Sequence, residues 1–203
     1  MEKTITKKRK INTRAIAATA MLSALAYVLQ FIEFPVPFMP AFIQFDISEL
    51  PALIASFAYG PVSGIVVCLV KNVINVILKF QTMGVGELSN FILGVLFVVP
   101  AGIIYKHKKT KVGAVLGAAV GAVVSAVVCF FSNYYIVYPI YAKLLMPKEA
   151  ILAMYQAILP SVKNLAEAIL IFNVPFTFAK FAIVAVLTFL IYKHISPILK
   201  GKM

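Results

Sequence analysis

Lys180 is a charged side chain near the middle of the last long apolar run of this sequence. Thr177 lies about one helical turn before it and Asn173 a further turn back, so the three would form a polar stripe on one helix face. Asn133 lies near the end of another long apolar run. A charge inside a membrane span is costly and by default marks a binding site or a buried pair. These four residues predict a site for an uncharged ligand rich in carbonyl and ring-nitrogen acceptors.

Two other interpretations of these polar residues stay open. The stripe can make hydrogen bonds between helices, with Lys180 reaching towards the membrane surface or pairing with a carboxylate such as Glu167 or Asp46. A second stripe, on an earlier apolar run, can face the ligand, a partner protein or neighbouring helices. Its members are Lys71, Asn72, Asn75 and Lys79.

The sequence lacks the motifs that would give it a catalytic centre or an energy source. It has no G-x-x-x-x-G-K-[ST] for ATP phosphates, no CxxC and no nucleophile elbow. His107 and His194 lie in basic ends, and Cys68 and Cys129 lie inside apolar runs, as small buried side chains do. These features predict a binding protein that is not an enzyme and has no metal site and no cofactor of its own.

The composition defines the surroundings in which these side chains act. Of the 203 residues, 62% are apolar and 13% are charged, and the mean hydropathy is +0.97. Soluble domains are about half apolar and about a quarter charged, so the chain is predicted to be a polytopic membrane protein. The net charge of +12 is concentrated beside apolar runs, as the positive-inside rule describes. Membrane lipid, and not nucleic acid, is therefore the expected partner of the basic segments.

Charge-free runs predict where the chain crosses the membrane. Four runs are long enough to span a bilayer, the last of them interrupted by Lys180. The basic stretches at the N-terminus and at 106–111 are expected on the same cytoplasmic side, which requires an even number of crossings between them. The four runs cover residues 15–32, 88–105, 112–142 and 168–192.

The middle of the sequence decides the number of crossings. Residues 50–70 can form one span, or Gly60 and Pro61 can form a turn between a short helix at about 50–59 and a full one at 61–79. The second arrangement gives the even number. We therefore predict an all-α polytopic membrane protein of six transmembrane helices, with a short second helix and both termini cytoplasmic.

The short second helix leaves part of the membrane thickness to the residues before it, because ten helical residues span about 15 Å. Pro35, Pro37 and Pro40 prevent a regular helix there. We expect residues 33–47 to be a re-entrant outer lid loop over a ligand pocket, or otherwise a loop on the headgroups. The chain is expected to be one membrane-embedded domain over 1–203, with a basic cytoplasmic tail at 1–13, a cytoplasmic basic loop at 106–111 and an outer loop at 143–164.

Three stretches of the sequence carry a resemblance to a known family. They are FPVPFMPAFIQFDISELPALIASFAYGP (34–61), GVGELSNFILG (84–94) and NVPFTFAK (173–180). Over nearly its whole length the chain resembles the substrate-binding (S) component of energy-coupling factor (ECF) vitamin transporters, specifically the riboflavin type. The resemblance implies that it binds riboflavin from outside and joins a transmembrane coupling (T) subunit and two ATP-binding-cassette ATPases. ATP acts through those partners, and the vitamin is released inside.

The resemblance also implies which residues bind. In the riboflavin type an asparagine of the fifth helix and a lysine of the sixth reach the flavin, and these map to Asn133 and Lys180. The family's asparagine three positions before the lysine is Thr177 here. An alanine motif on the first helix contacts the coupling subunit and maps to Ala20 and Ala24. The expected riboflavin-binding residues are Phe38, Met39, Pro40, Ala41, Phe42, Asp46, Glu87, Asn90, Asn133, Asn173, Thr177 and Lys180.

A flavin needs a flat apolar slot for its rings and a few donors at its pyrimidine edge. We expect Phe38, Met39 and Phe42 to form the slot and Lys180 to donate to ring carbonyls. Other hypotheses are an S component for another vitamin and a stand-alone secondary transporter. A further one is an integral-membrane enzyme acting on lipids, for which the outer acidic pair, Asp46 and Glu49, lacks a histidine.

Overall fold

Helices make up most of the structure, a computed structural model that describes residues 13–79 and 82–200. The basic tail expected at 1–13 therefore lies, apart from Thr13, outside the described residues. In chain order the elements are α1 (Thr13–Phe31), β1 (Phe34–Pro35), β2 (Gln44–Phe45), α2 (Glu49–Tyr59), α3 (Pro61–Lys79), α4 (Val85–His107), α5 (Lys111–Ser132), a π-helical segment η1 (Asn133–Val137), α6 (Tyr138–Leu144), α7 (Lys148–Gln156), α8 (Leu165–Ala168), a second π-helical segment η2 (Ile169–Asn173) and α9 (Val174–Lys200).

The described helices confirm the predicted class of a polytopic, helical membrane protein. Five helical stretches are long and apolar enough to cross a membrane, namely Thr13–Phe31, Pro61–Lys79, Val85–His107, Lys111–Leu144 and Leu165–Tyr192. The short second helix is present as α2, with 11 residues. It is separated from α3 by Gly60, whose φ of 100° lies in the left-handed region that favours glycine. One addition to the all-α prediction is a small antiparallel pair, in which Phe34 faces Phe45 and Pro35 faces Gln44.

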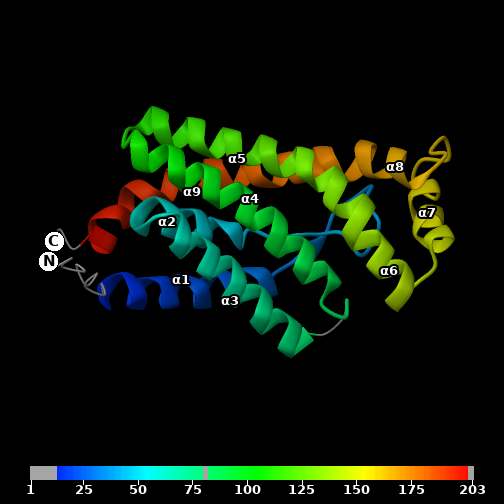
Figure 1. Cartoon of the computed structure of the whole chain (residues 1–203), viewed down its shortest axis with the longest axis horizontal. Helices are drawn as coiled ribbons and strands as arrows, with labels where there is room; N and C mark the ends of the chain where they lie inside the picture. The colour runs from blue at the N-terminus through cyan, green and yellow to red at the C-terminus, as the bar shows by residue number, and fades with distance from the viewer. Residues whose placement is uncertain (1–12, 80–81, 201–203) are drawn as a thin grey trace, which may run out of the picture.

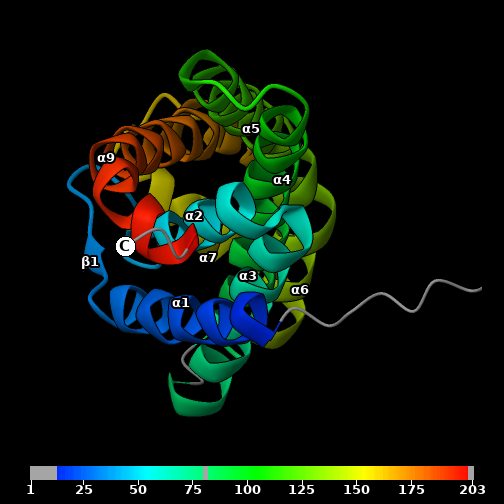
Figure 2. The ribbon, with the colours of Figure 1, turned by 90° about the vertical axis from the view of Figure 1, so that its left-hand side faces the viewer.

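The short helix α2 occupies the centre of the bundle (Figure 2). It packs against α1, α3, α4 and α9. All its residues from Glu49 to Phe57 are buried. A helix that is apolar around its whole circumference is stable where other protein elements surround it. This explains how a helix too short to cross a bilayer forms here: its neighbours, and not lipid, cover its sides.

Helices α4 and α5 lie side by side (Figure 1). Their close packing depends on small residues of α5. A Cβ added at Gly121 would lie 2.2 Å from the carbonyl oxygen of Phe97, so the two helices approach too closely for any side chain there. Further along α5, the Ser125 hydroxyl donates a hydrogen bond of 3.0 Å to the carbonyl oxygen of Leu93. This face of α5 is therefore an internal helix interface.

The two ends of the bundle differ in character (Figure 1). One end carries the start of α1, the α4–α5 connection and the end of α9. The other carries the loop with β1 and β2, together with α6 and α7. Near this second end, η1 and η2 interrupt helices that the sequence predicts to be regular. Such π-helical insertions occur frequently at functional sites. Here Asn133 is the first residue of η1 and Asn173 is the last residue of η2.

Candidate ligand-binding site

A cavity of about 330 Å³ lies at the end of the bundle that carries β1 and β2. Its wall is formed by the 33–48 loop, α2, α3, α4, the η1–α6 junction and the η2–α9 junction. Both apolar and polar side chains line it, the mixture typical of small-molecule pockets. The expected binding residues that line it are Ala41, Phe42, Glu87, Asn90, Asn133, Asn173, Thr177 and Lys180.

Four other expected residues do not line this cavity. Phe38 lies at a loop turn, where its φ is 62° and its side chain is 83% exposed, while Met39 and Pro40 follow in the same turn. Asp46 is buried behind the wall. Of the three residues expected to form the apolar slot, Phe42 is the one at the cavity, where its ring packs against two tyrosines of α6. The reversal of the backbone at Phe38 explains the difference, because the chain returns to the cavity only at Ala41.

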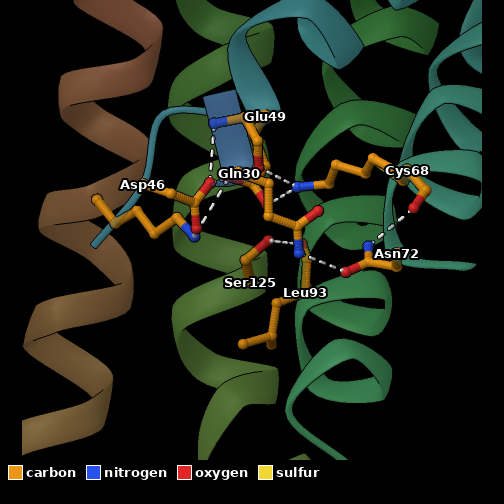
Figure 3. A network of polar contacts seen from close by, with 10 residues as sticks. Gln30, Asp46, Glu49, Cys68, Asn72, Leu93 and Ser125 are labelled. Carbon is orange, nitrogen blue, oxygen red and sulfur yellow. Dashed lines mark hydrogen bonds and ion pairs between the residues drawn. The ribbon is translucent and has the colours of Figure 1, made fainter. Parts of the chain in front are cut away.

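A buried network of four charged residues holds Lys180 in the wall (Figure 3). Its Nζ lies 2.8 Å from Oδ2 of Asp46 and 3.3 Å from Oε2 of Glu49. Oε1 of Glu49 accepts from Nζ of Lys71 at 2.7 Å. The two ammonium and two carboxylate groups balance in charge, which lowers the cost of burying each of them. Asp46, one of the two carboxylates suggested as partners, is the one that pairs with Lys180.

The Asp46 carboxylate also organises the start of α2. Its Oδ1 accepts from the backbone N–H of Ser48 at 2.8 Å and from the Ser48 hydroxyl, which in turn accepts from Lys71. Burial by itself raises the pKa of Asp46, but the nearby charges of Lys180 and Lys71 lower it more, and the pKa lies well below its usual range. Asp46 is therefore ionised at neutral pH and holds the loop, α2 and α9 together.

Two buried tyrosines fix the amide of Asn173. The Tyr155 hydroxyl donates to Oδ1 of Asn173 at 2.7 Å, and Nδ2 of Asn173 donates to the Tyr138 hydroxyl at 2.7 Å. The two hydroxyls are also hydrogen-bonded to each other, so the three side chains form a closed cycle of hydrogen bonds. These contacts from two buried hydroxyls hold the Asn173 side chain in one position at the cavity wall. Its second N–H and its remaining lone pair stay available to a ligand.

The thiol of Cys129 is a shared hydrogen-bond acceptor for two residues that line the cavity. Nδ2 of Asn133 donates to Sγ at 3.1 Å, and the Thr177 hydroxyl donates to the same sulfur at 3.1 Å. Oδ1 of Asn133 accepts from the Ser89 hydroxyl at 3.4 Å. Cys129 is buried, as the sequence predicted. Its role in positioning Asn133 and Thr177 was not predicted.

The second polar stripe divides among different neighbours. Asn72 accepts from Nε2 of Gln30 on α1 at 3.1 Å. Lys71 belongs to the charge network described above. Asn75 donates to Oε1 of Glu87 at 2.9 Å. Lys79 is paired with Glu33 at 2.7 Å. The stripe therefore connects α3 with neighbouring elements, and Asn75 and Lys79 also line the cavity.

Comparison with known families identifies the chain. Residues 14–192 match the sequence model of the family described as ECF transporter, substrate-specific component. The chain belongs to this family. The S component described here is also similar to a solved S component of a bacterial ECF transporter, with a TM-score of 0.73 and 31% identity, covering 94% of this chain and 99% of that one.

Curated relatives of this S component carry transporter names. It is 32% identical to the riboflavin transporter RibU of Staphylococcus aureus, over 95% of this chain and 97% of the relative. It is 28% identical to the riboflavin transporter FmnP of Bacillus subtilis, over 92% and 94%. The family and these relatives make it a transporter component and not an enzyme.

Several residues of the S component reach the site without having been expected there. Tyr138 lines the cavity, whereas Tyr155 and Cys129 act through other residues. Glu49 was considered in connection with an enzyme, but it lines the cavity. The available signal was the i, i+4 spacing of Cys129 and Asn133, which places the thiol one turn from the amide. No local pattern links Tyr155 to Asn173.

Proposed function

We propose that this chain is the riboflavin-binding subunit of an ATP-driven ECF-type vitamin importer. The observation that carries the proposal is the position of Lys180 in the wall of a cavity of about 330 Å³. Support for the ligand comes from the two relatives named riboflavin transporters, which match almost the full length of the chain. Cavities of roughly 300–1,000 Å³ accommodate ligands of this size.

The cavity wall suits a flavin in two respects. Phe42, Phe176 and Phe181 supply apolar surface for the ring system. Lys180 supplies an ammonium donor for ring carbonyls, and the amides of Asn133 and Asn173 supply further donors. Lys180 acts as a donor to the vitamin and not as a nucleophile. Phe38 and Met39 contribute to binding only if the loop moves, because neither lines the cavity.

Transport requires partners that hydrolyse ATP. As the family relationship suggests, the chain would associate with a transmembrane coupling subunit and two ATP-binding-cassette ATPases, which drive release of the vitamin inside. Ala20 and Ala24 are the proposed contacts for the coupling subunit, and both are exposed on α1. Small exposed residues one helical turn apart allow close approach of another helix.

The proposed orientation places the cavity outside and both termini in the cytoplasm. It is supported by Arg14 and the basic 106–111 segment, which lie at the end of the bundle away from the 33–48 loop. Basic residues concentrate on the cytoplasmic side of membrane proteins. In this orientation the 33–47 segment is the lid loop and 143–164 is an outer loop.

Purification of the full chain in detergent tests the ligand. A yellow preparation with a flavin absorption spectrum, or quenching of added riboflavin fluorescence at one ligand per chain, is expected. A colourless protein that quenches no riboflavin would contradict the proposal and favour another vitamin. Uptake into proteoliposomes separates the transport hypotheses: the chain alone should bind but not accumulate riboflavin, whereas accumulation without coupling subunits would indicate a stand-alone transporter.

A further inference from the structure

Glu87 differs from the other charged side chains of the cavity wall in its partners. The other four are Glu33, Lys79, Glu49 and Lys180. Lys79 pairs with Glu33 at 2.7 Å, and Glu49 and Lys180 belong to the charge-balanced network. Among the residues that the structure describes, no lysine or arginine forms an ion pair with Glu87. The cavity wall therefore carries an unbalanced negative charge at Glu87.

Neutral groups hold the Glu87 carboxylate in place. Nδ2 of Asn75 donates to Oε1 at 2.9 Å, and the Thr82 hydroxyl donates to Oε2. The side chain is nearly buried, and Glu87 lies in the first turn of α4. The positive end of the helix dipole offsets part of the cost of burying this charge. Acidic side chains are nevertheless seldom buried without a cation, which points to a role for the charge at the cavity.

Three successive turns of α3 give the depth of Glu87 in the cavity. Lys71 belongs to the charge network around Lys180, and Asn75 donates to Glu87. Lys79, one turn further along, lies at the partly exposed rim. Four residues of an α-helix rise about 6 Å. Glu87 is therefore held roughly one helical turn above the level of the network and one turn below the rim.

The sugar-alcohol chain of a flavin would reach the level of Glu87. In the proposed function, the pyrimidine edge of the ring system meets Lys180. The chain branches from the central ring and so lies on the rim side of that edge. The phosphate ester FMN differs from riboflavin only at the end of this chain, where a phosphate monoester carries about −1.5 to −2 charges at pH 7.

Resting on the proposed function, we propose that Glu87 excludes phosphorylated flavins, so that the site selects the uncharged vitamin. Like charges in a poorly hydrated cavity repel each other over several ångströms, so the effect requires no direct contact. Selection by repulsion also leaves the contacts to the ring system unchanged. Glu87 is then a specificity-determining residue of the binding site.

Three ligands separate charge from size. Riboflavin, FMN and riboflavin 5′-acetate, which enlarges the end of the chain without adding charge, are titrated against the full chain by fluorescence quenching. The unchanged protein should bind riboflavin at least about 10-fold more tightly than FMN, and should bind the acetate more tightly than FMN. Equal binding of riboflavin and FMN, or an acetate rejected as strongly as FMN, would overturn the inference.

Variants then assign the exclusion to Glu87. Glu87→Gln keeps the shape of the side chain and should narrow the riboflavin-to-FMN affinity ratio by roughly 10-fold, without changing the riboflavin-to-acetate ratio. Lys79→Gln leaves Glu33 unbalanced and should widen the first ratio. The matched control is Glu149→Gln, an exposed carboxylate of α7, which should leave both ratios unchanged. A riboflavin-to-FMN ratio that Glu87→Gln does not narrow would overturn the inference.

The outcomes separate this inference from the proposed function. An unchanged protein that binds no riboflavin contradicts the proposed function. An unchanged protein that binds riboflavin tightly but does not discriminate against FMN leaves the function standing and rejects the role of Glu87. If Glu87→Gln does not fold, the comparison of FMN with the acetate on the unchanged protein can still overturn the inference.

Discussion

Lys180 of α9 and Asp46 of the 33–48 loop are 134 positions apart in the sequence and form a buried ion pair at 2.8 Å. The loop therefore does more than border the cavity: its carboxylate fixes the ammonium group that lines it. Because Asp46 also binds Ser48, the start of α2 is held by the same group. Loop position, helix position and the donor in the cavity depend on one carboxylate.

Substituting the two lysines of this network should show that one of them affects riboflavin binding and both affect stability. Lys180 lines the cavity and Lys71 does not. Lys180→Met should weaken riboflavin binding by roughly 10- to 100-fold, the value of a lost hydrogen bond to a charged group. Lys71→Met should change affinity much less, while both variants lose about 3–5 kcal/mol of stability because a buried carboxylate loses its partner. Fluorescence titration and thermal unfolding in detergent measure the two effects, and equal affinity losses would contradict the assignment.

Tyr155 predicts an indirect effect on binding. The side chain is fully buried and does not line the cavity, but its hydroxyl orients Asn173. Tyr155→Phe should lower stability by about 1–3 kcal/mol and weaken riboflavin binding several-fold, because Oδ1 of Asn173 loses its donor. Tyr135→Phe, the same change at an exposed position, should alter neither. An unaltered affinity in a folded Tyr155→Phe variant would remove Tyr155 from the site.

Replacing a small residue by leucine should have different consequences on α5 and on α1, because one position is at an internal helix interface and the other is exposed. Gly121→Leu would force α5 away from α4, since even a Cβ lies 2.2 Å from the Phe97 carbonyl oxygen, and should prevent folding. Ala24→Leu, on the exposed face of α1, should leave unfolding and riboflavin binding unchanged but reduce co-purification with the coupling subunit. Normal assembly of the Ala24→Leu variant would place the partner on another surface.

An ion pair at the cavity rim predicts control of ligand release. Lys79 and Glu33 are paired at 2.7 Å, and both line the cavity. With side chains 17% and 18% exposed, they form a partly hydrated pair worth less than about 1 kcal/mol to stability. Lys79→Ala should speed riboflavin dissociation a few-fold in stopped-flow measurements, with little effect on unfolding. High salt should reduce the difference from the unchanged protein. The exposed Lys143→Ala serves as control, and identical dissociation rates would exclude a role of the pair.

The sequence by itself predicted the long apolar helices, the turn at Gly60 and a cation within the last span, whose burial was one of the alternatives. These are local properties: hydropathy over about 20 residues defines a span, and a glycine before a proline marks a turn. The stripe of Asn173, Thr177 and Lys180 follows from helical spacing in the same way. Its three members line the cavity, although Asn173 ends a π-helical segment that no local pattern indicated.

Only the tertiary structure decided which polar groups pair with one another and which side chains reach the cavity. Asp46 and Glu49 are nearly equivalent in sequence, yet they have different partners. Asp46 accepts from Ser48 of its own loop and from Lys180 of α9, whereas Glu49 accepts from Lys71 of α3 and forms an ion pair with Lys180. Phe38 and Phe42 are likewise similar by type, but a backbone reversal turns the first away from the cavity. Such differences depend on contacts between residues far apart in the chain, to which hydropathy and spacing are insensitive.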